Sequence, residues 1–269
     1  MRFDLGPALL FCPADRPERF AKAAARADAV ILDLEDAVAA GAKSAARGNI
    51  IDSDLDPART IVRINPLDSE HVASDLSTLS QTDYRTVMVA KSESAKKIAK
   101  LLDPRFRVIA LCETARGVVN ADKIAALDQV VALMWGAEDL VASLGGTSSR
   151  KKNGRYRDIA RHARSRVLLA AGARGKAAID AVHLDIADAK GQLREAKDAA
   201  ASGFAATACI HPSQVALVRD AYRPDAATLA WARAVLATAQ SQRGVFSFEG
   251  RMVDEPVLRH ARSVLARAH

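Results

Sequence analysis

The hydrophobic pattern alternates between short apolar runs and longer stretches with helical periodicity. Eight near-continuous apolar runs are typical of strands buried on both faces, as in parallel sheets: 8–12, 29–34, 60–64, 86–90, 107–112, 130–135, 178–182 and 207–210. Amphipathic stretches lie between and after them: 17–27, 39–51, 68–79, 93–102, 118–127, 156–173, 190–201 and 214–221. This alternation predicts an α/β fold of the (β/α)8 TIM-barrel type. A doubly wound open sheet is the alternative, but no Gly-x-Gly-x-x-Gly follows the first run.

The chain continues beyond the eighth strand–helix unit. We expect a barrel over residues 1–222 and a C-terminal extension over residues 223–269. The extension begins with a helix from Pro224 to about Gln240, continues through a polar and aromatic stretch at 243–254, and ends in a helix from about Pro256. Because the barrel does not need this extension to close, we expect it to pack on a neighbouring subunit or to cover an end of its own barrel.

Composition and charge exclude several classes of protein. With 49% hydrophobic and 26% charged residues, the chain of 269 residues is typical of a globular protein and not of a disordered one. No apolar run approaches the roughly 20 residues of a membrane helix, and the start has no long apolar signal core, so we expect a cytoplasmic protein with no membrane partner. The net charge of +7 is spread along a chain with only 4% aromatic residues, which disfavours nucleic acid as a partner. A polyanionic small-molecule ligand would account for the charge, and so would a generally basic, Ala- and Arg-rich proteome. Three cysteines without a Cys-x-x-Cys pair exclude a closed disulfide framework and disfavour a structural zinc site.

Polar residues cluster where the predicted strands end, which is the edge of a barrel that carries active sites. Glu113 and Asp139 close two consecutive strands. Two carboxylates without clustered His or Cys make an oxygen site that suits Mg²⁺. The structural alternative is that Glu113 pairs with Arg116 and that Asp139 caps a helix starting at Leu140.

An acidic cluster and two cations lie at neighbouring strand ends. Strand alternation places Asp33 and Glu35 on one face and Asp36 on the other. One of them is a candidate base or a ligand reached through water; alternatively, they pair with Arg63 or Lys91. Arg63 interrupts an apolar strand, where a cation is costly unless it is paired or used, so it is a candidate to hold a carboxylate or an enolate oxygen.

A basic segment follows the first predicted strand. Arg16, Arg19 and Lys22 lie at a helix start and are candidates to bind phosphate, although a solvated charged turn is the simpler interpretation. No Gly-x-Ser-x-Gly elbow is present, and His211 before Pro212 is better explained as a turn residue than as a base.

Eight short motifs in order carry a family resemblance. They are FCPADRPERF at 11–20, ILDLEDAV at 31–38, VRIN at 62–65, KSES at 91–94, ETARG at 113–117, GAEDL at 136–140, IHPSQ at 210–214 and GRMVD at 250–254. Together they cover nearly the whole chain. The chain resembles the citrate lyase β-subunit-like (CitE-like) proteins of the superfamily of HpcH/HpaI aldolases and malyl-CoA and citramalyl-CoA lyases.

The resemblance implies a fold and a set of site residues. It implies a TIM barrel assembled as a homotrimer, with Glu113 and Asp139 as Mg²⁺ ligands. Arg63 would contact substrate and steady an enolate, and Gly136, Ala137 and Glu138 would hold a keto-acid carboxylate. Glu35 and Asp36 would organise water near the metal. Asp254 would reach the active site of the neighbouring subunit.

The resemblance also implies a reaction and its partners. The expected activity is cleavage or formation of the carbon–carbon bond of a 3-hydroxy-3-carboxyacyl-CoA, giving an acetyl-CoA-type thioester and glyoxylate or pyruvate. The ligands are therefore a CoA thioester and a small keto acid, and thioester hydrolysis is an expected side activity. The alternatives are a citrate lyase β subunit acting on a citryl-acyl carrier protein, a class II aldolase acting on free keto acids, and a non-catalytic CoA-binding protein.

Overall fold

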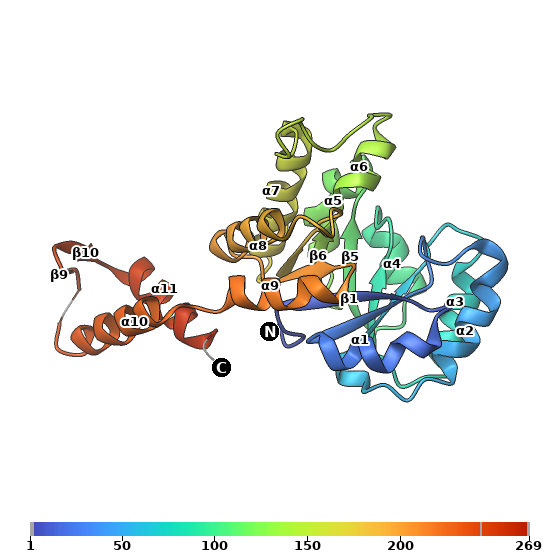
Figure 1. Cartoon of the computed structure of the whole chain (residues 1–269), viewed down its shortest axis with the longest axis horizontal. Helices are drawn as coiled ribbons and strands as arrows, with labels where there is room; N and C mark the ends of the chain where they lie inside the picture. The colour runs from blue at the N-terminus through green and yellow to red at the C-terminus, as the bar shows by residue number, and fades with distance from the viewer. Residues whose placement is uncertain (1–2, 243, 268–269) are drawn as a thin grey trace. The chain divides into compact units, whose positions relative to one another are not determined.

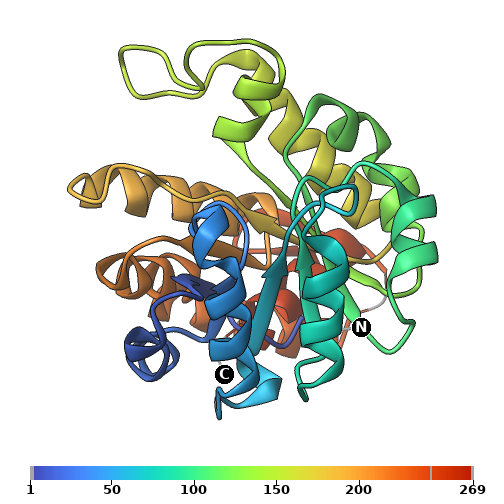
Figure 2. The same cartoon turned by 90° about the vertical axis from the view of Figure 1, so that its right-hand side faces the viewer.

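The structure is a computed structural model that describes residues 3–242 and 244–267. Eight parallel strands follow one another around a closed barrel, in which β8 pairs with β1. Figures 1 and 2 show the strands with the helices around them. The strands are β1 (Ala8–Pro13), β2 (Ala29–Asp33), β3 (Thr60–Ile64), β4 (Thr86–Val89), β5 (Arg107–Cys112), β6 (Val130–Trp135), β7 (Ala177–Asp180) and β8 (Ala206–Cys209). The predicted (β/α)8 barrel is confirmed.

The barrel core is built from alternate residues of the strands. Leu9, Ile31, Ile61, Met88 and Ile109 form one buried cluster, each from a different strand. Their neighbours along each strand are also buried, because helices cover the outside of the barrel. The register pairs Asp33 of β2 with Arg63 of β3, so the carboxylate and the guanidinium start from adjacent backbone positions.

Helices follow the strands, largely where the periodicity predicts them. The barrel helices are α1 (Phe20–Arg26), α2 (Lys43–Ile51), α3 (Val72–Ser80), α4 (Ala95–Leu101), α5 (Ala115–Ala125), α6 (Ala137–Ser143), α7 (Asp158–Ala173), α8 (Ala189–Ser202) and α9 (Pro212–Tyr222). Short 3₁₀ turns precede α1, α2 and β3: Pro17–Arg19, Ala40–Ala42 and Pro57–Arg59.

Several helix starts differ from the prediction, and two of them have a local cause. Helix α5 begins at Ala115 rather than Val118, because the Thr114 side chain accepts a hydrogen bond from Gly117 N and caps the first turn. Helix α6 follows β6 directly and begins at Ala137, whereas the alternative weighed for Asp139 placed a helix start at Leu140. Its N-cap is Gly136, which has no side chain to signal a helix start, and Asp139 lies in its first turn instead of capping it.

The chain divides into two compact units, Met1–Val218 and Arg219–His269. The second unit contains α10 (Ala226–Ala239), a hairpin of β9 (Phe246–Phe248) and β10 (Arg251–Val253), and α11 (Glu255–Ala266). Its own small core includes Ala232, Val235, Val253, Ala261 and Val264. Arg243 of the predicted polar stretch lies outside the described residues.

The backbone angles of the hairpin turn explain why a glycine occupies it. Glu249 and Gly250 have φ angles of 49° and 75°, the left-handed pair that a two-residue hairpin loop requires. Gly250 therefore makes the expected turn, and Phe246 and Phe248 pack on the small core of this unit. No helix in the described part of the chain is long and apolar enough to span a membrane.

Candidate active site

A cavity of about 250 Å³ opens among the residues that end the barrel strands. Eight of the polar and loop residues selected from the sequence line it: Asp33, Asp36, Arg63, Glu113, Gly136, Ala137, Glu138 and Asp139. An apolar wall completes the lining with Phe11, Leu111, Met134 and Trp135. The lining comes from the ends of every barrel strand except β4, as the barrel fold predicts.

Three ionic contacts with two carboxylates hold Arg63 in the wall of this cavity. Its Nε and Nη2 atoms each donate to one oxygen of Asp33 at 2.6 Å, a bidentate fork. Its Nη1 atom lies 3.0 Å from Glu35 Oε2, and its guanidinium lies 4.8 Å from the centre of the Phe11 ring. A guanidinium has five N–H groups, so two remain for a ligand after these three contacts. The pKa of Arg63 is raised, because the charges of Asp33 and Glu35 outweigh the effect of burial.

Lys91 joins the acidic residues on the other side of the cavity. Its Nζ atom donates to Glu35 Oε1 and to Asp36 Oδ2, the latter at 3.1 Å, and lies 3.3 Å from Asp139 Oδ1. The prediction that Asp36 faces away from Glu35 is therefore wrong. Strand β2 ends at Asp33, so strand alternation does not extend to Asp36, and both carboxylates reach the same ammonium.

Opposing effects set the pKa values of these two carboxylates. Burial raises the pKa of Glu35 and outweighs the nearby charges of Arg63 and Lys91. Burial acts in the same direction on Asp36, but there the hydrogen bond from Lys91 prevails, and the pKa of Asp36 is lowered. The pKa of Lys91 is raised, because its carboxylate neighbours outweigh burial.

Glu113 is a buried carboxylate, and no side-chain cation of the described residues forms an ion pair with it. Its Oε1 atom accepts a hydrogen bond from the Lys91 backbone N–H at 3.1 Å, and the residue is 3% exposed. Burial, followed by the charge of Asp139, raises the pKa of Glu113 to about 8. The alternative pairing with Arg116 does not occur, because that guanidinium lies 3.9 Å from Glu93 instead. Gly136 packs against the carboxylate: a Cβ atom there would lie 2.9 Å from Glu113 Oε2.

This arrangement fits a divalent cation held by few protein ligands. Glu113 and Asp139 both line the cavity, and each has its charge only partly compensated. Among the described residues, no three His, Cys, Asp or Glu side chains are grouped to hold a metal. Two carboxylates with water and substrate oxygens are the coordination that Mg²⁺ commonly adopts. The residues present therefore fit the Mg²⁺ site expected from the sequence.

Arg16, Arg19 and His211 do not line the cavity, and Asp254 belongs to the other compact unit. Arg16 and Arg19 are exposed, 3.8 Å from Asp15 and 3.7 Å from Glu18 respectively, as in a solvated charged turn. Asp254 belongs to the second compact unit, where its Oδ1 atom accepts from Val257 N at 3.3 Å and caps α11. His211 lies directly before α9, with its Nδ1 atom 2.7 Å from Ser213 Oγ.

Some contributing residues were not selected from the sequence. The Trp135 indole lines the cavity, and Ser149 Oγ donates to Glu138 Oε1 at 2.6 Å, which orients that glutamate. Below the cavity, the buried Lys43 ammonium donates to the Leu34 and Glu35 carbonyls and to Asn65 Oδ1. Only the position of Trp135 at a strand end could have indicated a role; the other contacts join distant parts of the chain.

Comparison with known proteins identifies the family of this chain. The family model of the HpcH/HpaI aldolases and citrate lyases matches residues 8–212. The citrate lyase subunit beta-like protein of Mycobacterium tuberculosis is 61% identical over 263 residues, covering 98% of this chain and 96% of the relative. The mitochondrial citramalyl-CoA lyase of Homo sapiens is 32% identical over 293 residues, covering 97% of this chain and 85% of the relative.

A solved structure extends the similarity to three dimensions. The crystal structure of protein CitE from Mycobacterium tuberculosis, in complex with magnesium, acetoacetate and coenzyme A, superposes with a TM-score of 0.93 at 60% identity and covers 98% of each chain. The magnesium in that relative agrees with the metal expected here from the carboxylates. The family resemblance is confirmed: this chain belongs to the HpcH/HpaI aldolase/citrate lyase family of carbon–carbon lyases.

Proposed function

We propose that this protein is a Mg²⁺-dependent lyase that cleaves or forms the carbon–carbon bond of a 3-hydroxy-3-carboxyacyl-CoA. Malyl-CoA and citramalyl-CoA are the substrates of this class, and the products are an acetyl-CoA-type thioester with glyoxylate or pyruvate. The observation that carries the proposal is that Arg63, Glu113 and Asp139 line one cavity. The Arg63 guanidinium, together with two carboxylates that can hold Mg²⁺, suits a substrate with a hydroxyl, a carboxylate and a developing negative charge.

Three residues of the cavity lining have a direct role in this proposal. Glu113 and Asp139 would hold Mg²⁺, which when bound supplies Lewis-acid polarisation of oxygen ligands. Arg63 directs its two remaining N–H groups at the oxygen that gains charge as the bond breaks. Because Asp33 already fixes the fork, this stabilisation requires little reorganisation during the reaction.

The loop after β6 and the acidic residues complete the site. Gly136, Ala137 and Glu138 lie at the start of α6, where free backbone N–H groups favour a carboxylate ligand. Glu35 and Asp36 flank Lys91 and would organise water beside the metal. The same water would allow thioester hydrolysis as a side activity.

The second compact unit would contribute in a homotrimer. We assign Asp254 as the acid that protonates the enolate carbon in the site of a neighbouring subunit, or removes the proton in the condensation direction. Asp254 lies between a hairpin and α11, where Oδ1 caps the helix and Oδ2 has no hydrogen-bond partner among residues 3–242 and 244–267. Arg16 and Arg19 are exposed cations available to the phosphates of CoA.

Product analysis tests the function directly. The protein with Mg²⁺ is incubated with a panel of 3-hydroxyacyl-CoA thioesters and with citryl-acyl carrier protein, and the products are identified by mass spectrometry. We expect a shorter acyl-CoA and a 2-keto acid in equal amounts, and neither with Glu113→Gln. Cleavage of citryl-acyl carrier protein alone would indicate a citrate lyase β subunit, and ligand binding without any turnover would indicate a non-catalytic CoA-binding protein. Cleavage of free hydroxy acids only would indicate an aldolase that does not need the thioester.

A further inference from the structure

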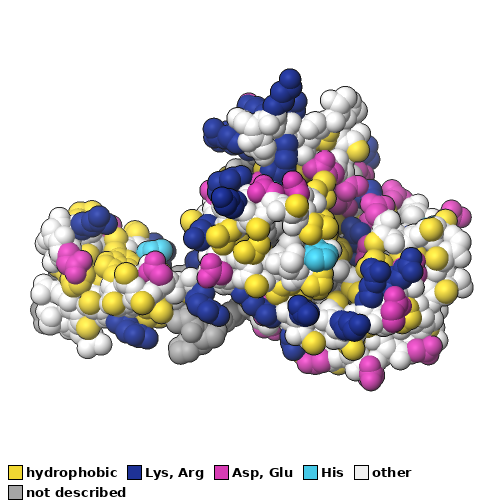
Figure 3. Space-filling model, in the orientation of Figure 1, with side chains coloured by type: hydrophobic (Ala, Val, Ile, Leu, Met, Phe, Trp, Pro, Cys, Tyr) yellow, Lys and Arg dark blue, Asp and Glu magenta, His cyan; other side chains and the backbone are white. Residues whose placement is uncertain are grey.

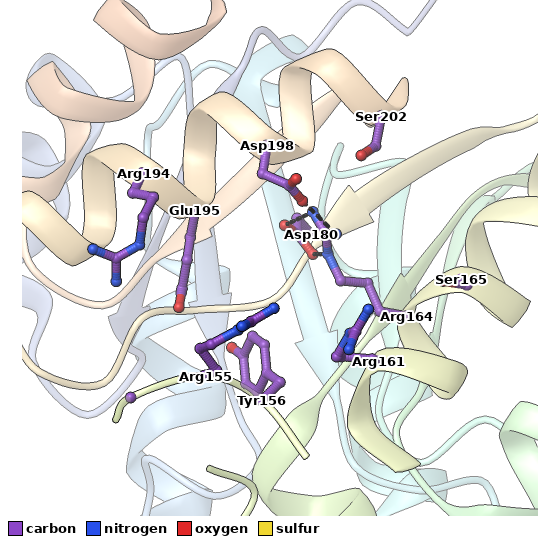
Figure 4. A pocket seen from close by; sticks show the side chains of 11 residues that line it. Arg155, Tyr156, Arg161, Arg164, Ser165, Asp180, Arg194, Glu195, Asp198 and Ser202 are labelled. Carbon is purple, nitrogen blue, oxygen red and sulfur yellow. Dashed lines mark hydrogen bonds and ion pairs between the residues drawn. The ribbon is translucent and has the colours of Figure 1, made fainter. Parts of the chain in front are cut away.

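A second cavity lies on the outside of the barrel, between α7 and α8. It has a volume of about 470 Å³, within the range of small-molecule sites, and belongs entirely to the first compact unit. Four arginines line it: Arg155, Arg161, Arg164 and Arg194. Figure 4 shows that they come from three elements, the loop before α7, α7 itself and α8, and surround a common space.

The carboxylates of this cavity are paired with arginines. Arg164 donates to both oxygens of Asp180, at 3.0 and 2.9 Å, and to Asp198 at 2.7 Å. Glu195 accepts from Arg150 Nη2 at 3.0 Å and lies 2.8 Å from His183 Nδ1. These pairs involve every acidic side chain of the lining, but two guanidinium groups face three carboxylates, which leaves one negative charge for the other arginines to offset.

The remaining arginines leave a surplus of positive charge. Within residues 3–242 and 244–267, no carboxylate lies within ion-pair distance of Arg155 or Arg194. Arg161 has only an exposed contact of 3.5 Å with Asp158. Lys151, Lys152 and Arg157 of the loop before α7 are exposed as well, which adds to the positive potential of this region; Figure 3 shows Lys and Arg side chains at this end of the barrel unit.

The loop that carries Arg155 is structured. Arg150 and Tyr156 form an antiparallel bridge, Lys151 N donates to Arg155 O at 2.8 Å, and Arg155 N donates to Asn153 Oδ1 at 3.2 Å. The Arg150 guanidinium stacks 3.8 Å from the centre of the Tyr156 ring, which in turn contacts Trp135 edge-on. The backbone of Arg155 is therefore positioned at the cavity, and its side chain projects across the space in Figure 4.

We propose that this cavity is a binding site for the phosphoryl groups of a small phosphorylated metabolite, with Arg155, Arg161 and Arg194 as its ligands. Guanidinium forks bind oxyanions in a bidentate manner. Phosphoryl oxygens diverge in three dimensions and can meet arginines that approach from three elements, whereas a carboxylate offers two oxygens in one plane. The Tyr156 ring, which also lines the cavity, supplies an apolar surface for the rest of the ligand.

The cavity has a direct structural connection to the candidate active site. Asp180, which lines it, accepts a hydrogen bond from Trp135 Nε1 at 2.6 Å. Trp135 lines the active-site cavity on the other side of this bond. A phosphorylated ligand bound in this cavity would therefore act as an effector of the candidate active site. This inference does not depend on which substrate the active site binds.

Calorimetric titration in Mg²⁺-free buffer tests the site. Inorganic pyrophosphate is the probe, succinate at matched ionic strength is the carboxylate comparison, and the full-length chain is used. The test variant is Arg155→Gln/Arg194→Gln. The control is Arg174→Gln, an exposed arginine at the opposite end of α7. We expect pyrophosphate to bind the wild type and the control equally, and the double variant at least 10-fold more weakly.

Three results would overturn the proposal. One is the absence of pyrophosphate binding to the wild type, and another is equal binding to the double variant, which would place the anion elsewhere on this basic chain. The third is succinate binding as tightly as pyrophosphate, which would show that the cavity does not select phosphoryl groups. Thermal unfolding of each variant confirms that the exposed substitutions leave the fold intact.

Discussion

Arg63 and Asp33 face each other from adjacent positions of β3 and β2, and both carboxylate oxygens lie 2.6 Å from guanidinium nitrogens. Asp33 also accepts from the backbone of Glu35 at 2.9 Å and of Ala37 at 3.2 Å, so it shapes the loop that carries the other acidic residues. One aspartate therefore orients both the cation and the carboxylates of the cavity.

Substitution of Asp33 is expected to cost both stability and activity. Asp33→Asn leaves the buried Arg63 with Glu35 as its nearest charge, and breaking a buried pair costs about 3 kcal/mol in the free energy of unfolding. Urea denaturation measures this change. Asp68→Asn, which breaks the exposed pair with Lys97, is the control and should cost less than about 1 kcal/mol. Equal losses in the two variants would contradict the role of Asp33.

Arg63 is expected to act on the transition state more than on substrate binding. Arg63→Lys keeps the charge but loses the fork, so kcat should fall by on the order of 10²–10³, as for the loss of one oxyanion donor. Steady-state kinetics separate the two effects. An unchanged kcat with a raised KM would show that Arg63 only binds substrate.

Removal of the metal is expected to abolish turnover. Glu113 and Asp139 are the only carboxylates assigned to the metal, so excess EDTA should stop the reaction and added Mg²⁺ should restore it. Glu113→Gln should stay inactive at all Mg²⁺ concentrations with an unchanged circular dichroism spectrum. Asp122→Asn, at an exposed pair on α5, serves as the control that keeps metal-dependent activity. Full activity in EDTA would refute the site.

Asp254 is expected to act across a subunit interface. Asp254→Asn and Glu113→Ala should each be inactive alone, and hybrid oligomers should regain activity because some sites then contain both intact residues. Native mass spectrometry verifies mixing before the assay. Absence of recovery in verified hybrids would leave Asp254 with its capping role at α11 alone.

Acid destabilisation is expected to depend on Glu195. Burial opposes ionisation, but hydrogen bonds with His183 and Arg150 lower the pKa of Glu195 to about 2. A lowered pKa contributes stability above the unfolded value near 4.5, and this stability is lost as pH falls from there through about 2. Glu195→Gln should therefore flatten the decline of the free energy of unfolding between these pH values. Parallel declines in the two proteins would contradict this coupling.

The sequence predicted the barrel fold but only part of the geometry of the site. Apolar runs identified every barrel strand, and strand ends identified Arg63, Glu113 and Asp139, because both features follow from local periodicity. The interpretation of Asp36 failed where β2 ends, since alternation applies only within a strand. The start of helix α6 was misplaced because Gly136 is an N-cap without a side-chain signal. Lys91 adopts a left-handed backbone with φ of 46°, and no periodic pattern indicates that its amide would meet Glu113.

The close approach of Gly136 to Glu113 makes it possible to change the position of a carboxylate without changing its charge. A methyl group at residue 136 would meet Glu113 at 2.9 Å from Oε2 and 3.0 Å from its Cβ atom. Gly136→Ala therefore displaces the glutamate while its charge and chemical identity stay the same, whereas Glu113→Gln removes the charge and keeps the shape. The two substitutions form a matched pair that measures, at one carboxylate, how much of its contribution is position and how much is charge.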